Sequence, residues 1–149
     1  MAKGIPLSRL AFVALVVLLP ISARAAGTVT RTAAESFGDR TSKYTYTWVS
    51  DGSGDVSGDT TTIVVATGDV VRIEIVPNGG GTQPTDLYDL TLLDSHGVDM
   101  LDGQAANLSN SAAAVLFTSF RVDSSETFQL VIANAGNAKG GTLKLWVSR

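Results

Sequence analysis

The sequence predicts an all-β protein, a single-domain antiparallel β-sandwich of jelly-roll or immunoglobulin-like type with about seven or eight strands. Two observations predict this fold. Apolar and polar residues alternate over short runs rich in Thr, Val, Tyr and Ile, which is the period of a strand whose two faces differ. Gly, Asp and Asn turn residues separate these runs, and no long segment has the period of a helix.

The clearest strand is expected at 43–48, where Tyr44, Tyr46 and Trp48 share one face and form part of the core. The further strands are expected at Thr61–Val65, Val71–Ile75, Tyr88–Leu93, Ala114–Phe120, Thr127–Ile132 and Leu143–Val147. Ile73, Ile75, Leu130, Ile132, Leu143 and Leu145 complete the predicted core. A helical turn is expected only at Gln104–Ala113.

Residues 1–25 have the layout of a secretory signal peptide. Lys3 and Arg9 precede the apolar run Leu10–Leu19, and small residues lead to a cleavage point between Ala25 and Ala26. The run is shorter than the ~20 residues that a membrane-spanning helix needs. We therefore expect export to the periplasm or medium without stable membrane insertion, with an uncleaved anchor as the alternative. Residues 26–42 are then an irregular arm or an edge strand, and residues 43–149 the sandwich.

The composition excludes several classes of site. Removing Lys3, Arg9 and Arg24 from the 11 basic residues leaves 8 against 14 acidic ones, a net charge of −6 in the cleaved chain. Such an acidic chain without basic clusters is not expected to bind nucleic acid, because phosphates must be neutralised by Lys and Arg. The absence of cysteine excludes disulfides, thiolate nucleophiles and Cys-ligated metals.

Stretch 88–103 carries four aspartates and the only histidine of the chain: Asp89, Asp94, His96, Asp99 and Asp102. The acids fall where a strand would end and turns would begin, and Asp in a turn accepts hydrogen bonds from nearby backbone amides. Because His96 is the only histidine and there is no cysteine, we expect neither a catalytic triad nor a multi-histidine metal site. The sequence therefore predicts structural turns here and no enzyme; an unusual Ser- or Asp-based active site is the remaining alternative.

Loop 51–59 is the better metal candidate, because Asp51, Asp55 and Asp59 offer carboxylate oxygens of the kind that Ca²⁺ prefers. The loop departs from an EF-hand, which requires Gly and an acidic residue where this chain has Val56 and Thr62. We therefore expect a hairpin loop with no metal or other cofactor, and structural Ca²⁺ is the alternative.

Three further motifs have ordinary explanations. Gly79–Gly81 lacks the strand, helix and lysine of a phosphate-binding loop and is expected to be a flexible connection. Asn107 begins a glycosylation sequon, which matters only in a eukaryotic secretory route. The aromatic face of Tyr44, Tyr46 and Trp48 is expected to be core, with a sugar-stacking surface as the alternative.

Three stretches of the sequence belong together: YTYTWVSD with the GDVSG that follows (44–58), PTDLYDLTLLD with GVDML and GQAANL (84–108), and NAGNAKGGT (134–142). In this order they resemble a known family, the small virion structural proteins of tailed bacteriophages. The order and spacing of these turn motifs carry the resemblance, which covers about Lys43 to Val147.

The resemblance implies a β-sandwich subunit of a phage particle, with no catalytic residues, whose partners are other protein subunits or further copies of itself. The family does not normally carry a signal peptide, so this chain departs from it at the N-terminus. The expected function is a non-enzymatic structural protein, located in a virion or exported if derived from one. The alternative is an exported bacterial module that binds a polysaccharide or attaches to surfaces through Ca²⁺. Contact surfaces are expected at sheet edges and at loops Ser50–Asp59 and Asn78–Pro84.

Overall fold

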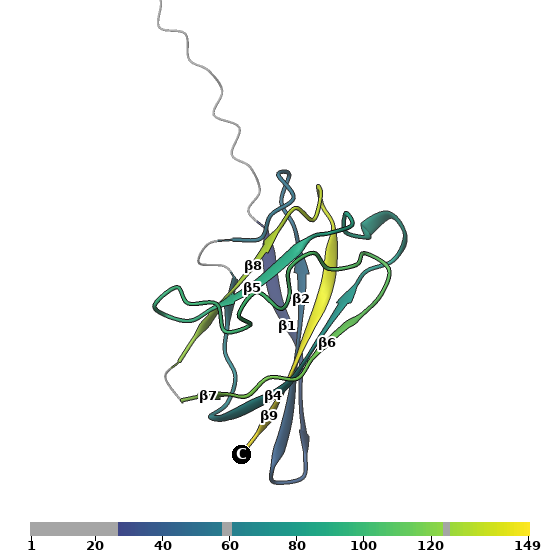
Figure 1. Cartoon of the computed structure of the whole chain (residues 1–149). Helices are drawn as coiled ribbons and strands as arrows, with labels where there is room; N and C mark the ends of the chain where they lie inside the picture. The colour runs from purple at the N-terminus through teal and green to yellow at the C-terminus, as the bar shows by residue number, and fades with distance from the viewer. Residues whose placement is uncertain (1–26, 58–60, 124–125) are drawn as a thin grey trace, which may run out of the picture.

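The computed structural model describes residues 27–57, 61–123 and 126–149, which form two antiparallel sheets around one core (Figure 1). The strands are β1 (Thr28–Phe37), β2 (Thr41–Val49), β3 (Thr62–Ile63), β4 (Gly68–Pro77), β5 (Asp89–Leu93), β6 (Ala114–Leu116), β7 (Phe120–Val122), β8 (Phe128–Ala133) and β9 (Gly140–Ser148). The larger sheet has the order β1-β2-β9-β4-β6, with β7 also paired to β4, and the smaller has β3-β8-β5. The all-β sandwich prediction is confirmed.

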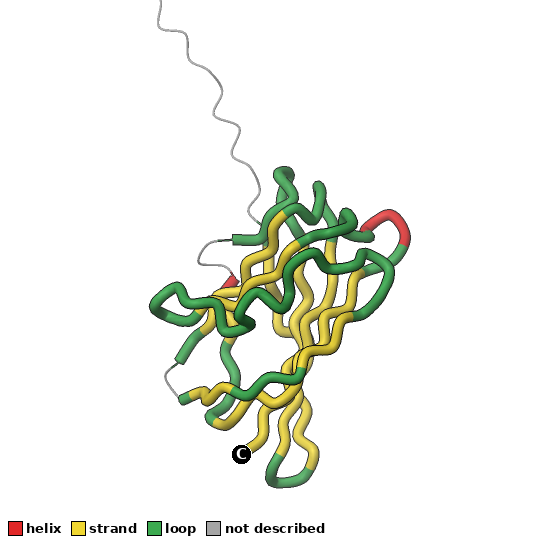
Figure 2. The backbone as a smooth tube through the Cα atoms, viewed as in Figure 1, coloured by secondary structure: helices red, strands yellow, loops and turns green. Residues whose placement is uncertain are grey.

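The alternating pattern of the sequence becomes alternating burial, because successive side chains of a strand point to opposite faces. Each strand with a long alternating run buries every second residue, as in β2, β8 and β9. The predicted core is confirmed, since these nine residues are all buried: Tyr44, Tyr46, Trp48, Ile73, Ile75, Leu130, Ile132, Leu143 and Leu145. The smaller sheet supplies the other side of the core through β5 and β8 (Figure 2).

The described residues contain nine strands, more than expected, because the run Ala114–Phe120 is divided between β6 and β7. Both pieces pair with β4, where Ile73 faces Leu116 and Val70 faces Phe120. Three steps along β4 therefore face four steps along the edge strand, so one extra residue must bulge out of the ladder. β6, the intervening residues 117–119 and β7 together form one interrupted edge strand, called here the β6–β7 edge.

The strand predicted at Thr61–Val65 is reduced to two residues, β3. Two tyrosine hydroxyls form hydrogen bonds with backbone groups that would otherwise have paired in a longer β3. The Tyr46 hydroxyl donates a hydrogen bond to the Val64 carbonyl, and the Tyr44 hydroxyl accepts one from the Ala66 amide at 3.1 Å. The segment 64–66 is thereby fixed across the inner face of β2 instead of continuing a ladder.

Of the two alternatives for residues 26–42, the structure has the edge strand, β1, whose outer side has no partner among the described strands. The β1–β2 hairpin extends beyond the rest of the sandwich (Figure 1). The predicted signal peptide and its cleavage point at Ala25 lie outside the described residues.

The helical turn predicted at Gln104–Ala113 is wrong. The segment forms successive turns, and Asn107 within it has a positive φ angle that a helix does not allow, as does Asp102 just before it. The short 3₁₀ turn η2 lies instead at Gly80–Thr82, within the connection that was expected to be irregular.

Candidate interaction surface

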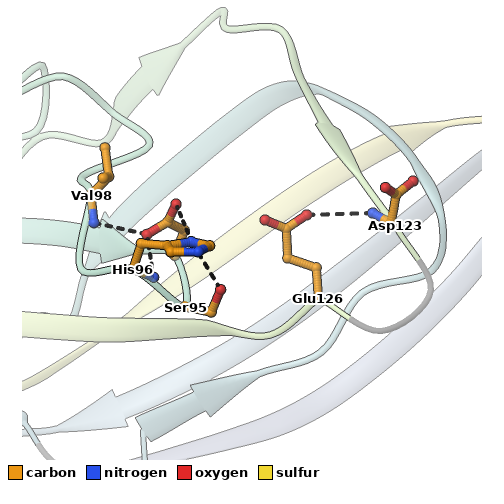
Figure 3. Close-up of polar contacts among 6 residues, drawn as sticks. Ser95, His96, Val98, Asp123 and Glu126 are labelled. Atoms are coloured by element: carbon orange, nitrogen blue, oxygen red, sulfur yellow. Dashed lines mark hydrogen bonds and ion pairs between the residues drawn. The ribbon is translucent and has the colours of Figure 1, made fainter.

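The histidine-containing stretch is a turn, as predicted (Figure 3). The Asp94 Oδ1 atom accepts hydrogen bonds from the amides of His96 and Val98, both at 2.8 Å, and Gly97 has a φ of 81°. These hydrogen bonds, the one from Val98 first, hold the pKa of the Asp94 carboxyl below its ordinary value. The carboxylate therefore fixes the path of the chain.

Asp94, Ser95 and His96 do not have the arrangement of a hydrolase triad. Ser95 Oγ and Asp94 Oδ2 both lie near the same ring nitrogen, Nδ1 of His96, at 3.3 and 3.7 Å. A triad requires the serine on one ring nitrogen and the carboxylate on the other. The His96 side chain is 83% exposed. Nearby, Glu126 accepts a hydrogen bond from the Asp123 amide at 3.4 Å.

The other aspartates of the stretch also bind backbone amides. Asp99 accepts three, from Leu92 at 3.2 Å, Leu101 at 3.0 Å and Gly103 at 2.9 Å. Asp89 accepts one from Asn107 at 2.8 Å. These carboxylates satisfy amides that turns would otherwise leave unpaired. The prediction of structural turns is confirmed for Asp94 and Asp99. Asp89 is instead the first residue of β5, and Asp102 occupies a left-handed turn position.

The proposed calcium ligands are directed to the protein's own backbone. Asp51 Oδ1 accepts hydrogen bonds from the amides of Ser53 at 2.7 Å and Asp55 at 3.0 Å, and Asp55 Oδ1 accepts one from Asn134 at 3.3 Å. Asp59 lies outside the described residues. Across residues 27–57, 61–123 and 126–149, no group of three or more His, Cys, Asp or Glu side chains has a metal-binding arrangement.

The aromatic face of β2 is core rather than a sugar-stacking surface, because Tyr44, Tyr46 and Trp48 are all buried. Burial raises the pKa of the Tyr46 hydroxyl, which is therefore a neutral hydrogen-bond donor to Val64. A shallow open depression of about 370 Å³ lies beside this pair, lined by Arg31, Tyr46, Thr62 and Val64. It offers one cation and few polar groups, so it is not a built ligand site.

The two loops expected to make contacts lie at one end of the sandwich, joined through the β8–β9 turn (Figures 1 and 2). Ser50 Oγ donates to the Gly136 carbonyl and accepts from the Lys139 amide at 2.9 Å. Lys139 Nζ donates to the Gly81 carbonyl at 2.8 Å. Loops from three parts of the sequence therefore form one connected surface. Positions 58–59 of the first loop lie outside the described residues.

The most exposed large apolar side chain described is Phe117, on the β6–β7 edge, with 78% of its surface accessible. Val115, two residues earlier on the same outer face, is 42% exposed. The inward residues of this edge, Leu116 and Phe120, pack against the core. The other side of the edge has no partner strand in the described part of the chain. Ala114–Phe120 is predicted from the sequence only as one further strand, and the signal that this prediction misses is a run with apolar residues on both faces.

The chain was compared with protein families, with curated proteins and with solved structures. No protein family, curated protein or solved structure matches the chain. Within the described ranges, no helix has both the length and the apolar character needed to cross a bilayer. The functional argument therefore depends on the exposed surfaces.

Proposed function

We propose that this protein is a non-enzymatic structural subunit, of a phage virion or derived from one, which assembles through protein–protein contacts. The observation that carries the proposal is the β6–β7 edge, which has no partner strand in the described part of the chain, carries no charge from Ala114 to Phe120 and exposes Phe117. The sandwich is the fold that the resemblance to virion proteins implies. The turn motifs that carry this resemblance stabilise the fold through hydrogen bonds. This agrees with a structural subunit that assembles in many copies through complementary surfaces.

The β6–β7 edge is suited to strand pairing with another subunit. Residues Ala114–Phe120, AVLFTSF, contain no charge, proline or glycine, and no strand of the described ranges pairs with their outer side. Such a segment on a sheet edge is an aggregation hazard unless a partner covers it. Covering this edge is therefore a physical need of the folded chain, and strand addition meets it.

The opposite edge, β1, is protected by devices that natural proteins use against strand pairing. Its ladder with β2 is interrupted by a bulge between Arg31 and Ala33. It also carries two charged side chains, Arg31 and Glu35, the second of which forms an ion pair with Lys43 at 2.9 Å. The β6–β7 edge also has a bulge, and Arg121 near its end is ion-paired with Asp69 and Asp123. Its uncharged run Ala114–Phe120 is what favours it over β1 as the contact surface.

A second copy of this chain is the partner that we propose for the edge. Antiparallel pairing of β6–β7 with its symmetry mate about a two-fold axis joins the two larger sheets into one. Because directly opposed residues in an antiparallel pair share a face, Phe117 and Val115 would meet outward-facing residues of the partner. The apolar side chains would then leave water at the centre of the interface, where aromatic residues contribute most.

Phe117→Asp and Phe37→Asp form a matched pair of variants that tests this assembly. Phe37 is also exposed, at 53%, but lies at the end of β1. Sedimentation velocity over a concentration series should show a larger species for the wild type and Phe37→Asp, and a shift toward monomer for Phe117→Asp. Circular dichroism should show all three folded. A wild type that stays monomeric at the highest concentration, or equal assembly of both variants, would contradict the partner proposed here.

The location of the protein is a separate part of the proposal. Peptide mass spectrometry on purified particles, periplasm and particle-free medium distinguishes a virion subunit from an exported derivative. Many copies in the particles would support the first, and soluble peptides beginning at Ala26 the second. Copies in particles that still carry residues 1–25 would contradict cleavage. The alternative of a sugar- or calcium-binding module has lost support, because its aromatic face is buried and Asp51 already binds amides.

A further inference from the structure

The loop that follows β4 begins with Asn78 and Gly79, and both are exposed. In an Asn-Gly pair the backbone nitrogen of the glycine can attack the asparagine side chain with little obstruction, because glycine has no Cβ and adopts many backbone conformations. We propose that Asn78 is a spontaneous modification site, at which deamidation through a cyclic imide converts the residue to aspartate and isoaspartate.

The reaction requires only water. The Gly79 nitrogen loses its proton to solvent and forms a bond to Cγ of Asn78, and the bond from Cγ to Nδ2 breaks. The leaving nitrogen takes up a proton and departs as ammonia, which leaves a five-membered succinimide. Water then adds to one of the two ring carbonyls. Opening on one side gives aspartate and on the other gives isoaspartate, in which the main chain runs through the side-chain carbon.

The surroundings of Asn78 leave both reacting groups free. The Gly79 amide donates to no acceptor in the described part of the chain, and the Asn78 carboxamide has no hydrogen-bond partner there. A Cβ placed on Gly79 would meet nothing within 4 Å, so this residue is surrounded by open space. The backbone amide of Asn78 still forms a hydrogen bond with the sheet, donating to the Gly140 carbonyl at 3.0 Å. The carboxamide lies beside the same residue, with Nδ2 of Asn78 2.9 Å from the position that a Cβ on Gly140 would occupy.

The two Asp-Gly pairs that could form the same ring are held by hydrogen bonds. At Asp102-Gly103, the attacking nitrogen of Gly103 donates to Asp99 Oδ2 at 2.9 Å. At Asp51-Gly52, the carboxylate of Asp51 accepts two amides through Oδ1.

The remaining described asparagines are less reactive for a different reason. Each is followed by a residue whose side chain obstructs the attack, at Asn107-Leu108, Asn110-Ser111, Asn134-Ala135 and Asn137-Ala138. The sequence supplies the reactive pair at Asn78, and the fold leaves it unrestrained.

The product changes the loop end of the sandwich. A new carboxylate appears in the same loop as Gly81, whose carbonyl accepts the Lys139 Nζ at 2.8 Å. Isoaspartate adds one carbon to the main chain directly after the sheet hydrogen bond of the Asn78 amide. We therefore expect the modified chain to be more acidic and altered locally in loop Asn78–Pro84. This inference does not depend on the β6–β7 edge or on any partner.

The test follows the purified full-length protein during incubation at neutral and mildly alkaline pH. Peptide mapping with fragmentation locates the mass increase of the amide-to-acid conversion, and an isoaspartyl methyltransferase labels isoaspartate. The matched control is Gly79→Ala, which adds a methyl group in open space at a residue whose φ of −101° any amino acid adopts. The control should fold normally and deamidate many-fold more slowly. Asn78→Gln should remove the signal at this position.

The expected result is conversion first at Asn78, faster at higher pH, with more isoaspartate than aspartate. Isomerisation at Asp102 should be slow in the folded protein and become faster in urea, because unfolding releases the Gly103 amide. The proposal is overturned if another asparagine reacts first, if Asn78 remains intact while a matching unfolded peptide reacts, or if Gly79→Ala reacts as fast as the wild type.

Discussion

Replacement of Trp48 with alanine should destabilise the protein by about 3 kcal/mol. The side chain is only 1% exposed, and its ring centre lies 5.7 Å from that of Tyr88. Truncating a buried tryptophan costs roughly 3–5 kcal/mol, since transfer free energy is lost and a cavity remains. The Trp48 Nε1 atom has no hydrogen-bond partner among the described residues. Removing an unsatisfied buried donor recovers part of the loss, which places the expected value near the lower end of the range.

The contact between Trp48 and β9 gives this prediction a second, independent readout. A methyl group on Gly141 would lie 2.7 Å from Cζ2 of the indole ring. Gly141→Ala should therefore cost about 1–3 kcal/mol in the wild type through overpacking. In the Trp48→Ala background the same methyl enters the vacated space and should cost far less. The two substitutions should thus be non-additive, as expected for residues in direct contact.

The assay is equilibrium unfolding in urea, followed by far-ultraviolet circular dichroism and by the fluorescence of Trp146, the other tryptophan of the chain. All four proteins of the double-mutant cycle are compared at one temperature. A loss below about 1 kcal/mol for Trp48→Ala would remove this residue from the core, given the ~3–5 kcal/mol of similar truncations. Additivity within about 0.3–0.5 kcal/mol would show that the ring does not lie against Gly141.

Three further predictions concern hydrogen bonds and ionisation. Tyr46→Phe should cost about 1 kcal/mol in urea unfolding, because the Val64 carbonyl loses its donor; no change would mean that water replaces the hydroxyl. Asp99→Ala should cost about 2–3 kcal/mol because three amides lose their acceptor, and Asp99→Asn, which keeps one oxygen, should cost less. Burial raises the pKa of Tyr88 from 10.0 to about 12, so stability is intact below pH 10 and should fall as the pH rises toward 12. Tyrosinate absorbance measured beside circular dichroism checks this, and ionisation of all three tyrosines near pH 10 in the folded protein would contradict it.

Much of the local structure could be predicted because its causes are local. The alternation of Tyr44, Tyr46 and Trp48 with polar residues fixes a strand and its inward face, since the period of side chains in a strand is two. Asp94 and Gly97 likewise specify their turn through hydrogen bonds and a φ angle that involve only neighbouring residues.

The candidate contact surface was only partly predicted. Sheet edges and loops were expected, but the sequence does not say which strand lies at an edge. In the sequence, Phe117 fits the alternating pattern of a strand with one buried face. Its exposure follows from the position of β6 and β7 at the sheet edge, where β4 is their only partner among the described strands. The division of that run arises from a one-residue shift against β4, which no local pattern records. A run of apolar residues is therefore ambiguous until its neighbours are known.

The sequence by itself determined the all-β class, the core residues of the long strands and the turns closed by aspartate. The tertiary structure alone decided the strand order, the open β6–β7 edge, and the reach of the Tyr46 hydroxyl to Val64. It also decided that Ser50 meets Lys139, which is 89 residues away. The physical reason is range: side-chain alternation and turn chemistry act over a few residues, whereas edges and loop contacts depend on which distant segments the collapsed chain brings together.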